Sequence, residues 1–121
     1  MDVNATEAAA IREFPDLEFL MALRAAGWHG LPPVIAADEI VQIDGFRIWG
    51  NGWRDGIRIR DRNDVLGIRI DAEYPPGLVW ELSGNLCEVA TALLELPVPG
   101  HRLAPQLVIG RAPQLWTPSS H

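Results

Sequence analysis

Hydrophobic residues near the end of the chain recur at the spacing of an α-helix. The apolar positions are Leu86, Val89, Ala90, Leu93 and Leu94. This spacing places the five side chains on one face, which can pack against a sheet. Asn85 precedes them as a candidate cap, Glu88 stands at the capping-box position, and Pro97 follows as a stop signal. The pattern predicts a helix over residues 85–96.

A second helical segment is predicted over residues 4–26. Asn4 is a candidate cap, and Gly27 is a natural C-terminal stop. The buried stripe of its second half is expected to be Leu17, Leu20 and Met21. Pro15 lies in the middle and lacks the N–H that a helix interior uses. It therefore either kinks one helix or separates two.

Between these segments the hydrophobic period changes from about 3.6 to 2, which is typical of strands. The five predicted strands are residues 39–43, 46–50, 57–60, 65–71 and 78–83. The turn signals between them are Asp44-Gly45, Asn51-Gly52, residues 61–64 and residues 75–77. Such short connections make neighbouring strands antiparallel. Residues 107–109 are expected to add an edge strand, and residues 113–121 to form a loose tail.

These elements predict one α+β domain over residues 1–121, with an antiparallel meander of about five strands and an N-terminal and a C-terminal helix packed on one face. Alternation then assigns side chains to the two faces. Those expected to face the helices are Phe46, Ile48, Ile57, Ile59, Leu66, Ile68, Ile70, Leu78, Trp80 and Leu82. Those expected on the outer face are Arg47, Trp49, Arg58, Arg60, Arg69, Glu81 and Ser83.

The outer face allows two interpretations. In the first it is a solvated surface, on which Arg69 pairs across strands with Glu81. In the second it is a docking surface for an acidic partner or for a second copy of the chain. The docking residues would be Arg47, Trp49, Arg58, Arg60 and Arg69. Tryptophan and arginine are the residue types most enriched at binding hot spots.

Composition narrows the classes of function. The 121 residues carry a net charge of −6, which disfavours general binding to nucleic acid or to an anionic membrane surface. All ten basic residues are arginine, so Schiff-base chemistry on lysine is excluded. The single cysteine, Cys87, has no partner for an internal disulfide. With no signal peptide pattern and no apolar run of about 18 residues, a cytoplasmic protein is expected.

Candidate catalytic chemistry is sparse. The three histidines, His29, His101 and His121, have no second histidine or cysteine at a metal-ligand spacing. No phosphate-binding loop or nucleophile elbow is present. We therefore predict no catalytic residue, no metal site and no cofactor.

Two hypotheses for function remain. The first is a non-enzymatic protein–protein interaction module that binds a protein partner or forms a homodimer. In element order the chain resembles small acidic secretion-chaperone and immunity-protein folds, a resemblance that no sequence motif carries. The alternative is a small-molecule-binding protein or enzyme with an apolar pocket between sheet and helices. Its lining would be Trp28, Tyr74 and Trp80.

Overall fold

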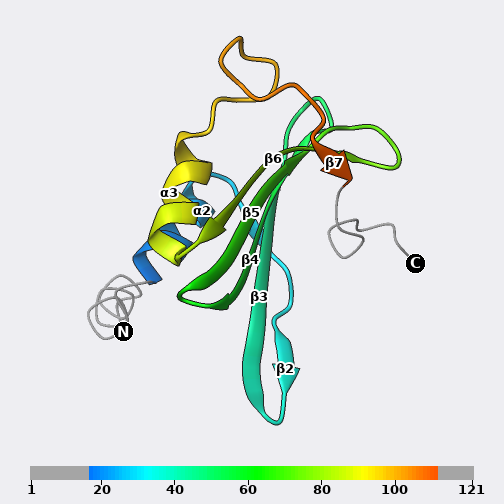
Figure 1. Cartoon of the computed structure of the whole chain (residues 1–121). Helices are drawn as coiled ribbons and strands as arrows, with labels where there is room; N and C mark the ends of the chain where they lie inside the picture. Colours follow the sequence, from blue (N-terminus) through cyan, green and yellow to red (C-terminus); the bar gives the residue numbers. More distant parts are fainter. Residues whose placement is uncertain (1–16, 112–121) are drawn as a thin grey trace.

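The computed structural model of the chain describes residues 17–111 (Figure 1). Within that range two helices, α2 (Leu17–Ala25) and α3 (Leu86–Glu95), accompany a seven-stranded sheet. The strands are β1 (His29–Gly30), β2 (Val34–Ala36), β3 (Glu39–Ile48), β4 (Arg54–Asp61), β5 (Asp64–Ile70), β6 (Gly77–Gly84) and β7 (Gly110–Arg111). The predictions for residues 4–16 and 113–121 lie outside the described residues.

The sheet is an antiparallel meander in the order β1-β3-β4-β5-β6-β7, and β2 also pairs with β3. The predicted α+β class is confirmed, with seven strands in place of about five. The strands that the period-2 pattern missed or misplaced are β1, β2 and β7. Each has only two or three residues, too few for alternation to register.

The predicted turn at Asp44-Gly45 is wrong, because β3 continues through it. Gly45 pairs with Ile57 of β4, and Asp44 pairs with Arg58. A Cβ atom at Gly45 would lie 3.3 Å from Cγ2 of Ile57. The glycine therefore gives room for close packing within a strand here, and does not mark a turn.

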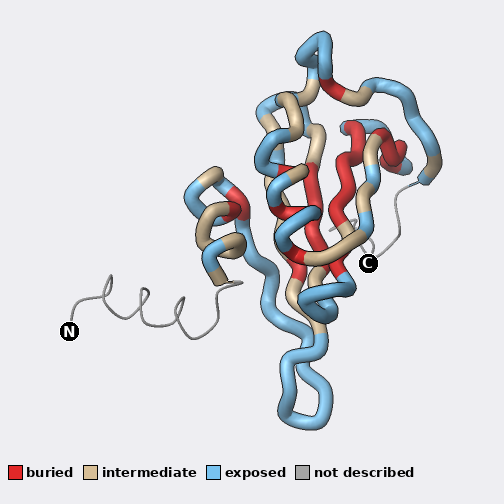
Figure 2. The backbone as a smooth tube through the Cα atoms, turned by 60° about the vertical axis from the view of Figure 1, so that its left-hand side comes forward, coloured by how far each residue is buried: buried red, intermediate tan, exposed pale blue. Residues whose placement is uncertain are grey.

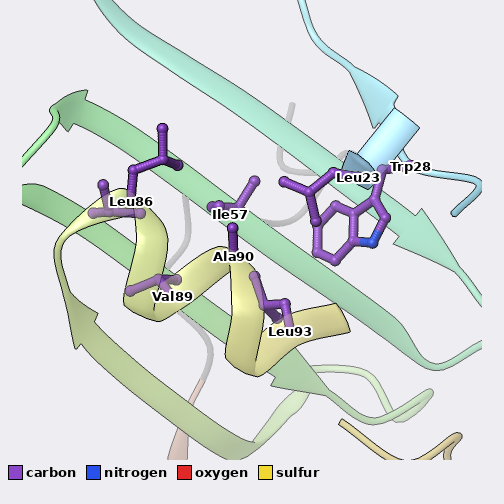
Figure 3. Close-up of a cluster of buried hydrophobic side chains, with 8 residues drawn as sticks. Leu23, Trp28, Ile57, Leu86, Val89, Ala90 and Leu93 are labelled. Carbon is purple, nitrogen blue, oxygen red and sulfur yellow. The ribbon is translucent and has the colours of Figure 1, made fainter. Parts of the chain in front are cut away.

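Both helices pack on one face of the sheet, where they enclose the main core. Its buried members are Leu23, Trp28, Ile57, Val65, Leu86, Val89, Ala90 and Leu93. Figure 3 shows side chains of α3 directed toward Ile57, with Leu23 and Trp28 beside it. The predicted cap of α3 is confirmed, since the backbone N–H of Glu88 donates to Oδ1 of Asn85 at 2.8 Å. The N–H of Leu86 also donates to the carbonyl of Arg62, which ties α3 to the β4–β5 turn.

The predicted facing of β5 is inverted in the structure. Leu66, Ile68 and Ile70 form a second cluster with Leu78, separate from the core that the helices cover. The cause is a bulge between Ile59 and Asp61, where the pairing shifts by one residue. A shift of one residue moves every following side chain to the other face.

The same register corrects the facing of β3. Phe46 and Ile48 pair with Gly56 and Arg54, on the face away from the helices. They were predicted to face the helices, and Ile48 is largely exposed. The prediction placed a turn at Asp44 and Gly45, but β3 runs straight through these residues. Because no turn resets the alternation there, Phe46 and Ile48 lie on the same face as Asp44.

The inverted facing makes Gly67 the point of closest approach between β5 and α3. A Cβ atom there would lie 2.8 Å from Cγ1 of Val89, which is completely buried. We predict that Gly67→Ala lowers the free energy of unfolding by about 1–3 kcal/mol, as overpacking does. Urea unfolding measures this loss of free energy of unfolding.

Gly50→Ala is the control, because a Cβ atom at Gly50 meets nothing within 4 Å. Equal urea midpoints for the two variants would contradict the packing described.

Candidate functional site

The predicted docking residues do not share one face of the sheet. On β4, Asp55 and Ile57 lie on the helix side, and Arg58 lies on the opposite side. Arg47 and Arg69 both pair with Asp55 across the ladder, so they too lie on the helix side. The predicted surface is therefore split between the two faces of the sheet.

Arg69 is buried in an ion pair with Asp55, and its predicted exposure is wrong. Its Nε lies 2.6 Å from Oδ1 of Asp55 and its Nη2 lies 2.9 Å from Oδ2, a bidentate arrangement. Its Nη1 donates to the carbonyl of Pro97, just past α3. The expected pair with Glu81 does not form, because Glu81 pairs with Ile68 and so lies on the other face. Arg69 thus links β4, β5 and the segment after α3.

Trp49 lies between two arginines beside this ion pair. The guanidinium carbon of Arg47 is 4.0 Å from the ring centroid, and that of Arg69 is 5.6 Å from it. Such cation–π contacts contribute about 0.5–2 kcal/mol each. The indole Nε1 is buried and has no hydrogen-bond partner among the described residues. Trp49 is half-buried and Arg47 lies over its ring, so only part of the ring is open to a partner.

The opposite face of the sheet carries a polar ladder across β3 and β4. Nε of Arg58 lies 2.8 Å from Oδ1 of Asp44, and both residues are buried. Nε2 of Gln42 donates to Oδ2 of Asp44, and Nε of Arg60 donates to Oε1 of Gln42 at 3.1 Å. The predicted exposure of Arg58 is therefore wrong, whereas Arg60 is exposed.

The aromatic residues of the alternative pocket are not brought together. Trp28 is buried in the core, and Trp80 is half-buried against the same core. Tyr74 is 82 % exposed, in the loop between β5 and β6. Of the three, only Trp28 lines the groove described next.

An open groove of about 180 Å³ lies between α2 and the sheet. It is lined by Leu20, Leu23, Arg24, Trp28, His29, Gly30, Ile43, Asp44, Gly45, Ile57 and Ile59. Small-molecule pockets usually enclose about 300–1,000 Å³. An apolar cavity of about 150 Å³ is enough for a benzene-sized molecule. The groove is therefore of a size to accept one or two aliphatic side chains from a partner.

A hairpin of β2 and the first residues of β3, residues 34–42, projects beyond the body of the sheet (Figure 1). We call this hairpin the arm. Figure 2 shows it almost entirely exposed. Its turn consists of Ala37 and Asp38, with φ angles of 52° and 65°, the left-handed pair that a two-residue hairpin loop requires.

The arm is apolar although it is exposed. Ile35 is 62 % exposed and Ile40 is 60 % exposed, and Val34 and Val41 are each more than 40 % exposed. Sequence reasoning assigned residues 39–43 to a strand but overlooked β2. The signal available was the apolar pair Val34-Ile35 directly after two prolines.

Ladder register places the two isoleucines on the groove side of the arm. Ile35 pairs with Ile40 and Val34 pairs with Gln42, so one step along β2 matches two steps along β3. This register shift interrupts the alternation of β3 at Val41 and puts the two pairs on opposite faces. Gln42 bonds to Asp44 on the face away from the helices. Ile35 and Ile40 therefore lie on the same side as Ile43, which lines the groove. The isoleucine side of the arm and the groove therefore lie on the same side of the sheet, and we call the two together the strip.

The buried ion pair gives a test of the cluster around Trp49. We predict that Asp55→Ala or Arg69→Met alone lowers the free energy of unfolding by about 3–5 kcal/mol, because each leaves a buried charge unpaired. The double variant Asp55→Leu, Arg69→Met should recover most of that loss. Urea unfolding is the measurement, with exposed Arg60→Met as the matched control. Single variants that lose less than about 1 kcal/mol would contradict a buried pair.

Comparison with known proteins gives no relative for this geometry. No protein-family model, curated protein or solved structure matches the chain. Neither helix in residues 17–111 is long and apolar enough to cross a membrane. Function is therefore inferred from the side chains of this chain alone.

Proposed function

We propose that this protein is a non-enzymatic interaction module that binds another protein chain through the arm. The observation that supports this proposal most is the exposure of Ile35 and Ile40 on a two-stranded ribbon that neither α2 nor α3 covers. Burying an isoleucine side chain fully contributes about 1.5–3 kcal/mol. A partner that covers both side chains would therefore gain a substantial part of an ordinary binding free energy.

The edge of the arm also favours a protein partner. Among the described residues, β2 pairs only with β3, so its other edge offers free N–H and C=O groups. Residues 31–36 carry no charge that would repel a second strand, although Pro32 and Pro33 confine pairing to β2 itself. Isolated two-stranded hairpins are only marginally stable in water, so a bound partner would also order the arm.

The outer sheet face with arginine and tryptophan that the sequence predicts as a docking surface supports binding less well. Arg58 and Arg69 are engaged in buried ion pairs, and Trp49 is half-buried beneath Arg47. A small-molecule site is also supported less well, since the groove is smaller than most ligand pockets. The arm with its adjoining groove therefore carries the proposal.

Photo-crosslinking tests the proposal directly. A benzoylphenylalanine side chain at position 35 of the full chain, produced in its native cells, should give a discrete adduct with one protein. The adduct should disappear when Ile40→Asp is added, because a charge on the same face of the arm prevents apolar contact. Gel shift and mass spectrometry identify the adduct.

The matched control places the same probe at Leu107, which is 82 % exposed and apolar but lies outside the arm. This probe should give no discrete adduct. If position 35 gives no adduct, or gives the same products as position 107, the proposed function is wrong.

A further inference from the structure

The arm and the groove are complementary to each other in shape, polarity and charge. The arm presents Ile35 and Ile40, and the groove is apolar and large enough for one or two such side chains. In one chain the arm cannot fill its own groove, because it runs straight out of the sheet away from α2 (Figures 1 and 2). The groove can therefore accept an arm only from another chain.

The arm carries only acidic charges, whereas the groove has Arg24 at its rim and a carboxylate, Asp44, that is already paired with Arg58. Asp38 and Glu39 stand at the tip of the arm, and residues 31–42 include no arginine. Arg24, exposed in the last turn of α2, lines the groove with His29 beside it. An acidic arm tip that enters the groove would bring a carboxylate toward Arg24, in a setting where such a pair adds specificity.

We infer that the partner of the arm is a second copy of this chain, and that the two arms dock reciprocally in each other's grooves. This inference rests on the proposed function and names its partner. The two arms run antiparallel about a two-fold axis, so each tip reaches the base of the other arm. The interface is isologous, as in most homodimers, because the same strip is used on both copies.

Two-fold symmetry sets how much area each copy has to contribute. A stable interface needs about 1,000 Å² in total, or about 500 Å² from each copy. Each copy contributes both an arm and a groove to the interface. The exposed apolar side chains on the groove side of the arm are Ile35 and Ile40. The dimer covers them without burying the ladder of Arg60 and Gln42 on the other face.

The oligomeric state of the full chain tests the inference. Light scattering after size exclusion, at concentrations up to about 1 mM, should give twice the mass of one chain. Ile40→Asp should weaken the dimer at least about tenfold, since it places a charge in an apolar contact. Urea midpoints measured at a concentration low enough for both proteins to be monomeric should stay unchanged, because Ile40 lies outside the core.

A charge swap tests the groove separately from the arm. Arg24→Glu alone and Asp38→Arg alone, at the turn of the arm, should each weaken the dimer about tenfold, and the two together in one chain should restore it. Arg102→Glu, on an exposed loop remote from both elements in the sequence, is the control and should have no effect.

Each outcome separates this inference from the proposed function. A dimer that depends on Ile40 and is restored by the charge swap supports it. A dimer that no arm or groove variant weakens overturns it, and so does a monomer at about 1 mM. A monomer whose position 35 still crosslinks to a different protein overturns the inference alone, and leaves the proposed function standing.

Discussion

Strand β3 is longer than the layer of helices that packs on the sheet. Its ten residues extend over about 33 Å, whereas the ten residues of α3 extend over about 15 Å and the nine of α2 over about 14 Å. The helices cover the part of the sheet that contains Ile57 and Val65, and the first residues of β3 lie beyond them. This difference in length leaves an apolar hairpin outside the core, and the inferred mode of binding follows from it.

The body of the sheet is held in register by charged residues that its interior would ordinarily exclude. Arg69 and Asp55 are almost completely buried, and they join two neighbouring strands to the chain that leaves α3. A buried pair of this kind fixes geometry more reliably than it adds stability. The Arg69 guanidinium also lies near the ring of Trp49, which Arg47 contacts as well. Of the predicted docking residues, Arg58 and Arg69 are therefore held in buried ion pairs, whereas Arg60 is exposed.

Sequence patterns predicted what depends on local chemistry. The helix at α3, its Asn85 cap and the turn at residues 61–64 all follow from residues close in the chain. The facing of β5 depends on one bulge near Arg60, and no local residue pattern announces a bulge. That shift explains why Arg69, expected outside, lies inside. The exposure of the arm could not be predicted, because an exposed isoleucine in a strand gives the same alternating pattern as a buried one. The pattern also does not show which part of the sheet the helices cover.

The central claim is that residues 34–42 stand free of the chain's own core and become covered only by a second chain. Amide hydrogen exchange at low and high protein concentration measures this directly. The account predicts that arm amides exchange rapidly in dilute protein and at least about tenfold more slowly in concentrated protein, while exchange at Ile57 and Val65 stays unchanged. Arm amides that exchange at the same rate at both concentrations would contradict it.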